Sequence, residues 1–120
     1  MLQKTAMSVF EVVGSPLCVA SSDGQKVYAR LATALKEGQK VVISFRNVKI
    51  LTSAFLNTAI GQLYGKFSEK KIRSLLDIAD MEQDDMVLLQ HVVKTAKRYF
   101  ADPERFKREL AEAMEESGVA

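Results

Sequence analysis

Residues 40–67 read KVVISFRNVKILTSAFLNTAIGQLYGKF, and this stretch decides the predicted fold. Its first part, residues 40–45, is an almost continuous apolar run of the kind found in strands covered on both faces. Between residues 53 and 67 the apolar side chains recur at helical spacing and share one face of a helix. Two adjacent hydroxyls, Thr52 and Ser53, precede that helix, and either could cap it. The stretch therefore predicts a central strand at 40–45 and a helix at 53–67.

The flanking residues continue the alternation of strands and helices. Runs of β-branched, aromatic and other apolar residues predict two more strands, at 7–13 and 72–78. Helical spacing and capping residues predict further helices at 22–37, 81–100 and 103–117. Strands that alternate with helices imply parallel pairing through right-handed crossovers. The predicted fold class is thus α/β, with a sheet of about three to four mainly parallel strands.

The composition fits one globular domain. The chain has 120 residues, of which 48% are hydrophobic and 27% charged, and its formal net charge is +2. At this length a domain buries enough surface to need no disulfide or metal staple. We expect one domain over residues 1–120, with a helical extension at 103–117. No apolar run approaches the length of a membrane helix and no secretory signal is evident, so we expect a cytoplasmic protein without a membrane partner.

No residue set in the sequence suggests catalysis. There is no GxGxxG motif and no glycine-rich loop ending in lysine and a hydroxyl. The single histidine, His91, falls inside a predicted helix, away from the strand ends where catalytic groups of open α/β sheets collect. The single cysteine, Cys18, has no cationic neighbour in sequence, and Asp77 with Asp80 offers too few oxygens for a hard cation. We therefore expect no catalytic residues, no metal site and no cofactor.

The hydroxyl pair at 52 and 53 allows two interpretations. In the first, Thr52 or Ser53 only caps the helix. In the second, one hydroxyl is exposed and can be phosphorylated, which would change the face offered to a partner without changing the fold. Gly61 and Gly65 lie one turn apart in the same predicted helix, and they also allow two interpretations. Either the glycines let the helix pack closely on the sheet, which we favour, or they form a groove for a partner.

A cluster of basic residues offers an alternative function. It consists of Lys66, Lys70, Lys71 and Arg73. Such a cluster could bind nucleic acid or an anionic ligand. The simpler interpretation is a solvated helix end and loop, because the run is shorter than the blocks of like charge typical of nucleic-acid arms. Nucleic acid is therefore not the partner we expect.

The segments VVISF, RNVKIL, TS and AFLNTAIGQLYGKF resemble the central part of STAS domains, the fold of bacterial anti-sigma-factor antagonists. They look closest to a STAS-like branch of uncharacterised bacterial proteins. The resemblance implies a small non-catalytic interaction module that binds a regulatory protein, either a kinase-type ATPase or an anti-sigma-like factor. It places the phosphorylated serine of the antagonists on Ser53, with Thr52 beside it, and we add Asn57 to the candidate partner-binding residues. The chain has Leu51 and Ala54 where the antagonists usually carry an acidic residue and a glycine.

The helix predicted at 103–117 has a narrow apolar stripe among many charges. The stripe consists of Phe106, Leu110, Ala113 and Met114. A helix of this kind can cover the sheet or pair with its copy in a homodimer. The sequence leaves both possibilities open.

Overall fold

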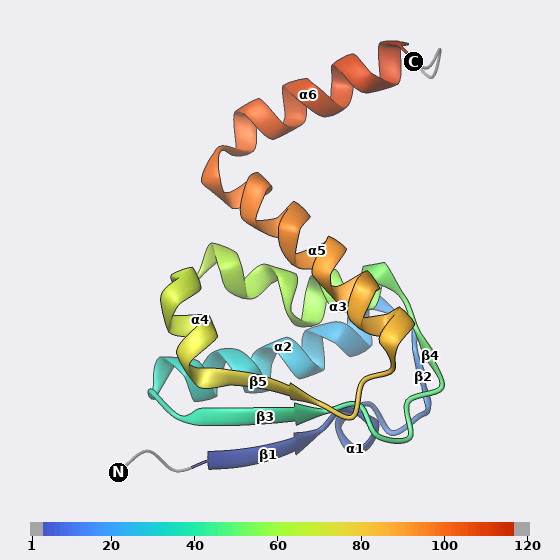
Figure 1. Cartoon of the computed structure of the whole chain (residues 1–120), viewed down its shortest axis with the longest axis vertical. Coiled ribbons are helices and arrows are strands. Elements are labelled where there is room, and N and C mark those ends of the chain that lie inside the picture. Colours follow the sequence, from blue (N-terminus) through green and yellow to red (C-terminus); the bar gives the residue numbers. More distant parts are fainter. Residues whose placement is uncertain (1–3, 117–120) are drawn as a thin grey trace.

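The computed structural model describes residues 4–116. Its main sheet contains β1 (Lys4–Ser8), β3 (Lys40–Ser44) and β5 (Leu76–Ala79) in the order β1-β3-β5, and both pairings are parallel. The central position of β3 confirms the prediction for residues 40–45. Helices lie over one face of this sheet (Figure 1). The α/β class with a parallel sheet is therefore confirmed.

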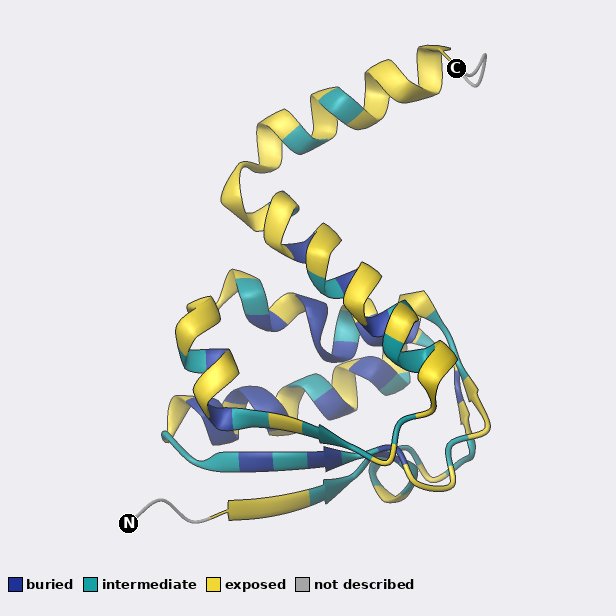
Figure 2. Ribbon diagram, in the orientation of Figure 1, coloured by how far each residue is buried: buried dark blue, intermediate teal, exposed yellow. Residues whose placement is uncertain are grey.

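Side chains of β3 show which face of the sheet carries the core. Val41 and Ile43 are fully buried, while Val42 between them is only partly buried. The register places Asp77 of β5 beside Val42, and Asp77 is exposed. One face of the sheet thus packs under the helices, and the other is open (Figure 2).

The helical layer is built mainly from α2 (Ser21–Lys36), α3 (Ser53–Ala59) and α5 (Gln83–Ala101). The predictions of helices at 22–37 and 81–100 are confirmed to within two residues at each end. Leu31, Leu35 and Phe55 are among the largest fully buried side chains. Because α2 packs on β3 and α3 packs on α2, the core extends from the sheet through α2 to α3. Among residues 4–116, none of the helices has both the length and the apolar character that a membrane crossing demands.

The strand predicted at 7–13 is wrong over most of its length. β1 ends at Ser8, and α1 (Val9–Val13) follows it directly. The Ser8 hydroxyl accepts a hydrogen bond from the Glu11 amide at 3.2 Å, and Gly14 ends the helix in the left-handed region at φ 79°. Side chains three and four residues apart share a helix face, so this apolar run serves a helix as readily as a strand.

The strand predicted at 72–78 is also wrong in its first half. Residues Glu69–Leu75 form α4, capped by the Ser68 hydroxyl, which accepts a hydrogen bond from the Lys71 amide at 3.1 Å. The buried residues of α4, Ile72 and Leu75, are three residues apart, as one helix face requires. The strand occupies only the last part of the predicted run and continues to Ala79.

The helix predicted at 53–67 starts at Ser53 but ends early. α3 stops at Ala59, and residues Gly61–Gly65 form the short 3₁₀ helix η1. Ile60 lies between them with φ −120° and ψ −44°, outside the helical geometry. Glycine is the weakest helix former after proline, so the two glycines that bound η1 favour this break.

Two short strands that the sequence did not predict fix the approach to α3. β2 (Leu17–Cys18) and β4 (Ile50–Leu51) pair in parallel and form a second, two-stranded sheet. Beyond them, the Thr52 amide donates to the Cys18 carbonyl at 3.2 Å. The backbone that enters α3 is thus held against the segment that leads into α2.

The helix predicted at 103–117 is present as α6 (Pro103–Glu116), and residue 117 lies outside the described residues. The Asp102 carboxylate accepts a hydrogen bond from the Arg105 amide at 3.1 Å and so caps it. α6 turns away from α5 and projects from the rest of the chain, rather than covering the sheet (Figure 1). No residue of α6 is buried.

Candidate functional site

A groove of about 730 Å³ lies between α3, η1, α5 and the start of α6. Its lining brings together two of the predicted site residues, Ser53 and Asn57. The other lining residues are Ala54, Gln62, Leu88, His91, Val92, Thr95, Ala96, Tyr99, Phe100 and Phe106. The predicted residues therefore lie at the edge of a largely apolar hollow, which we call the α3–α5 groove.

Thr52 is the N-cap of α3, and its hydroxyl proton is already committed to a backbone acceptor. Its Oγ1 donates to the Val19 carbonyl at 3.0 Å and accepts a hydrogen bond from the Phe55 amide at 3.2 Å. A hydroxyl has one proton to donate, so no donor remains for a ligand. Thr52 thus has a structural role: it joins the start of α3 to the segment after β2.

Ser53 differs from its neighbour. It is exposed at the first position of α3, and among residues 4–116 its hydroxyl has no hydrogen-bond partner. Asn57, one turn further on, is exposed as well. The local structure therefore separates the two residues: the hydroxyl of Thr52 holds the turn together, and Ser53 lies in the lining of the groove.

Aromatic rings form the far wall of the α3–α5 groove. The ring centroids of Tyr99 and Phe100 are 4.9 Å apart, and those of Tyr99 and Phe106 are 5.5 Å apart, both edge-to-face. Edge-to-face contacts of this kind stabilise aromatic pairs. The sequence did not predict this wall.

Gly61 and Gly65 pack against α5 and α3, not against the sheet as we had favoured. A Cβ at Gly65 would lie within 2.7 Å of three ring atoms of Phe100, and a Cβ at Gly61 would lie 2.7 Å from Asn57 Oδ1. Small residues are required where η1 meets the aromatic wall. The pair of glycines was the one sequence signal for this groove.

The lining of the groove is poor in ionisable side chains. None of its lining residues is Asp, Glu, Lys or Arg. A largely apolar lining of this kind favours apolar side chains of a partner and offers no Lys or Arg to an incoming anion.

The basic cluster lies elsewhere, on α4 and at the start of the turn that joins η1 to α4. Arg73 contacts the Glu69 carboxylate at 2.6 Å, and Lys97 of α5 contacts the same carboxylate at 2.6 Å. The hydrogen bond from Lys97 and the nearby positive charges lower the pKa of Glu69. Lys71 lies 5.2 Å from the centre of the Phe67 ring. Of the predicted cluster, Lys66 and Lys70 alone have no such contact within residues 4–116.

The residues considered for catalysis are not brought together. Cys18 is fully buried, and burial, with a smaller effect of Asp23, raises the pKa of its thiol to about 11. A neutral buried thiol is a poor nucleophile. Asp80 accepts a hydrogen bond from the Ser44 hydroxyl at 2.7 Å. Within residues 4–116, no three His, Cys, Asp or Glu side chains are grouped so that they could hold a metal ion.

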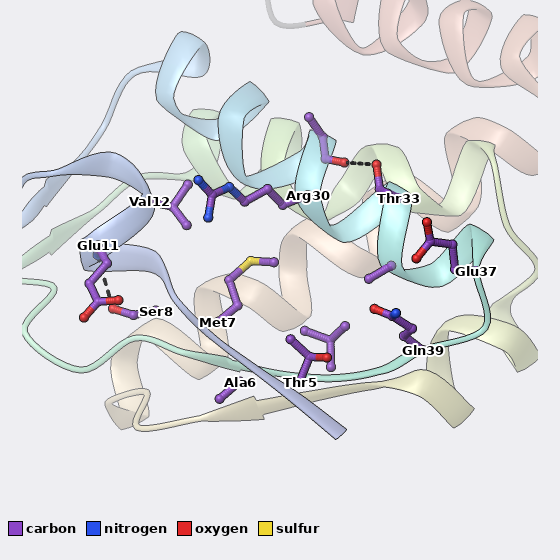
Figure 3. Close-up of a pocket in the computed structure, with 13 residues that line it drawn as sticks. Thr5, Ala6, Met7, Ser8, Glu11, Val12, Arg30, Thr33, Glu37 and Gln39 are labelled. Carbon is purple, nitrogen blue, oxygen red and sulfur yellow. Dashed lines mark hydrogen bonds between the residues drawn. The ribbon is translucent and has the colours of Figure 1, made fainter. Parts of the chain in front are cut away.

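A second hollow of about 560 Å³ lies between β1, α1 and α2 (Figure 3). Polar and charged side chains line it, among them Glu11, Arg30 and Glu37. The sequence did not predict this hollow, because the apolar run at residues 7–13 predicts a strand where α1 lies. It contains none of the predicted site residues.

Comparison with known families agrees with this architecture. The family model described as a STAS-like domain of unknown function matches residues 23–86, from the first turn of α2 to the first turn of α5. Comparison with curated proteins and with solved structures found no match. The matched segment contains β3, the Thr52–Ser53 turn, α3 and β5. It spans more than half of the 120 residues, and the chain belongs to this STAS-like family.

Proposed function

We propose that this chain is a non-catalytic protein–protein interaction module that docks a cytoplasmic regulatory protein in the α3–α5 groove. One observation supports this most strongly: Ser53 is exposed at the edge of a largely apolar groove, and within residues 4–116 its hydroxyl has no hydrogen-bond partner. The partner would place an apolar segment against Leu88, Tyr99 and Phe106. The STAS-like family membership is consistent with a kinase-type ATPase as that partner.

Phosphorylation of Ser53 would act as a release signal. A phosphoserine carries about −1.5 to −2 charge at pH 7. The groove lining supplies no Lys or Arg to pair with that charge, so docking an apolar segment over it would desolvate an unpaired anion. The unmodified form is therefore the binding form. Thr52 is not the modified residue in this proposal, because its hydroxyl is already committed to Val19 and Phe55.

Site-specific photo-cross-linking in the native cell tests the docking surface. Benzoylphenylalanine at His91, which is exposed in the groove, should capture a defined protein, identified by mass spectrometry. The matched control carries the same residue at Asp77, which is exposed on the open face of the sheet. Equal capture from both positions, or none from position 91, would remove the groove from the interface.

A further inference from the structure

α6 exposes a continuous apolar stripe. Phe106, Leu110 and Met114 are spaced four residues apart, so they share one helix face. Leu110 is 50% exposed and Met114 is 46% exposed. Monomeric proteins rarely hold large apolar patches in solvent, and an amphipathic helix normally buries its apolar face. The stripe is therefore a surface that another chain can cover.

The stripe continues past the bend between α5 and α6. Phe106 contacts Tyr99 edge-to-face at 5.5 Å, and the neighbouring Phe100 is 39% exposed. Arg98 of α5 contacts Glu109 of α6 at 2.8 Å. The apolar surface thus extends from the end of α5 along α6, which lengthens the area available for contact.

The charges of α6 are divided between its two halves. Residues 103–109 carry three basic and two acidic side chains, whereas residues 110–116 carry three acidic and no basic side chains. If two copies of α6 lie antiparallel, the more basic half of each faces the acidic half of the other. A parallel pair would set the acidic halves against each other. The charge pattern therefore favours a second copy of this chain in an antiparallel arrangement.

We infer that α6 is a homodimerisation helix, which pairs antiparallel with α6 of a second copy about a two-fold axis near Leu110. In this arrangement Phe106 lies against Met114 of the second copy, and the reciprocal contact is identical, as an isologous interface requires. Phe106 lines the edge of the α3–α5 groove and is shared by the two surfaces, whereas Leu110 lies outside the groove. A substitution at Leu110 therefore tests the dimer separately from the proposed docking of a regulatory protein.

Sedimentation equilibrium of the full chain tests the inference. We expect a mass of twice 13.3 kDa at high concentration, and a mass of 13.3 kDa for Leu110→Glu. The matched control is Ala111→Glu, which adds the same charge about 100° round the same helix and should stay dimeric. Circular dichroism of both variants checks that α6 remains helical. A wild-type mass of 13.3 kDa at every concentration, or equal loss of the dimer in both variants, would overturn the inference.

The salt dependence of the dimer tests the orientation. Antiparallel pairing brings opposite charges together, so added salt should weaken the dimer. A parallel pair would repel through its acidic halves, and salt would strengthen it. A dimer that tightens as salt rises would therefore overturn the antiparallel arrangement.

Discussion

Replacing Thr52 and Ser53 separately with alanine should have very different effects on stability. Thr52→Ala removes the N-cap of α3, whose loss costs about 1 kcal/mol. It also leaves the Val19 carbonyl without its donor, which costs about 1 kcal/mol more. The expected total is about 2 kcal/mol. Ser53→Ala removes a hydroxyl that has no partner within residues 4–116, so the expected change lies within about 0.5 kcal/mol.

Urea denaturation followed by circular dichroism measures both values. With a slope of about 2 kcal/mol per molar urea, Thr52→Ala should lower the midpoint by about 1 M at unchanged slope. Thr52→Ser is the control that keeps the hydroxyl, and it should recover most of the loss. If Ser53→Ala costs as much as Thr52→Ala, the division between a structural Thr52 and a free Ser53 is refuted.

Three further predictions follow from the packing and the charges. Gly24→Ala would put a Cβ 2.7 Å from the Phe55 carbonyl, and we expect this overpacking to lower the free energy of unfolding by about 1–3 kcal/mol. The better helix propensity of alanine offsets up to about 1 kcal/mol of that loss. The control Ser22→Ala, at an exposed position of the same helix, should change the free energy of unfolding by close to zero in the same urea assay. The pKa of the Cys18 thiol is raised to about 11 in the folded state, so between about pH 9 and 11 the folded thiol keeps its proton while the unfolded thiol ionises. The free energy of unfolding should therefore fall as the pH rises from about 9 towards 11. At about pH 8, iodoacetamide should label the folded chain far more slowly than the unfolded chain. The Glu69 carboxylate already pairs with Arg73 and Lys97, so we expect no salt-sensitive binding of the chain to DNA at low ionic strength. A filter-binding assay in which the chain retains DNA, with an affinity that falls steeply as salt is added, would contradict this.

The elements that could be predicted from sequence are those whose apolar residues follow a single pattern, either that of a strand or that of a helix. β3 was found because its apolar run is short and is followed by polar residues, and α2 and α5 because their helical spacing extends over several turns. The runs at 7–13 and 72–78 were misassigned because each joins a strand to a short helix. The caps were visible in both cases: Ser8 stands three residues before Glu11, and Ser68 directly precedes Glu69. In short segments such caps carry more information than apolar content.

The site was predicted only in part, for a geometric reason. Local sequence placed Ser53 and Asn57 at the start of a helix, which is where they lie. Which of the two hydroxyls is free depends on the Val19 carbonyl, 33 residues away in sequence, and no local pattern reports that contact. The groove likewise depends on how Phe100 and Phe106 meet η1 and α3 across the bend after α5.

The affinity of the cross-linked partner for two variants at position 53 tests the proposed function most directly. Ser53→Asp and Ser53→Asn have nearly the same size and differ in charge, so isothermal titration of the purified partner isolates the effect of an anion at the groove edge. We predict that Ser53→Asn binds within about threefold of the wild type and that Ser53→Asp binds at least about tenfold more weakly, or about 1.4 kcal/mol. Equal affinities for the two variants would show that Ser53 does not face the partner.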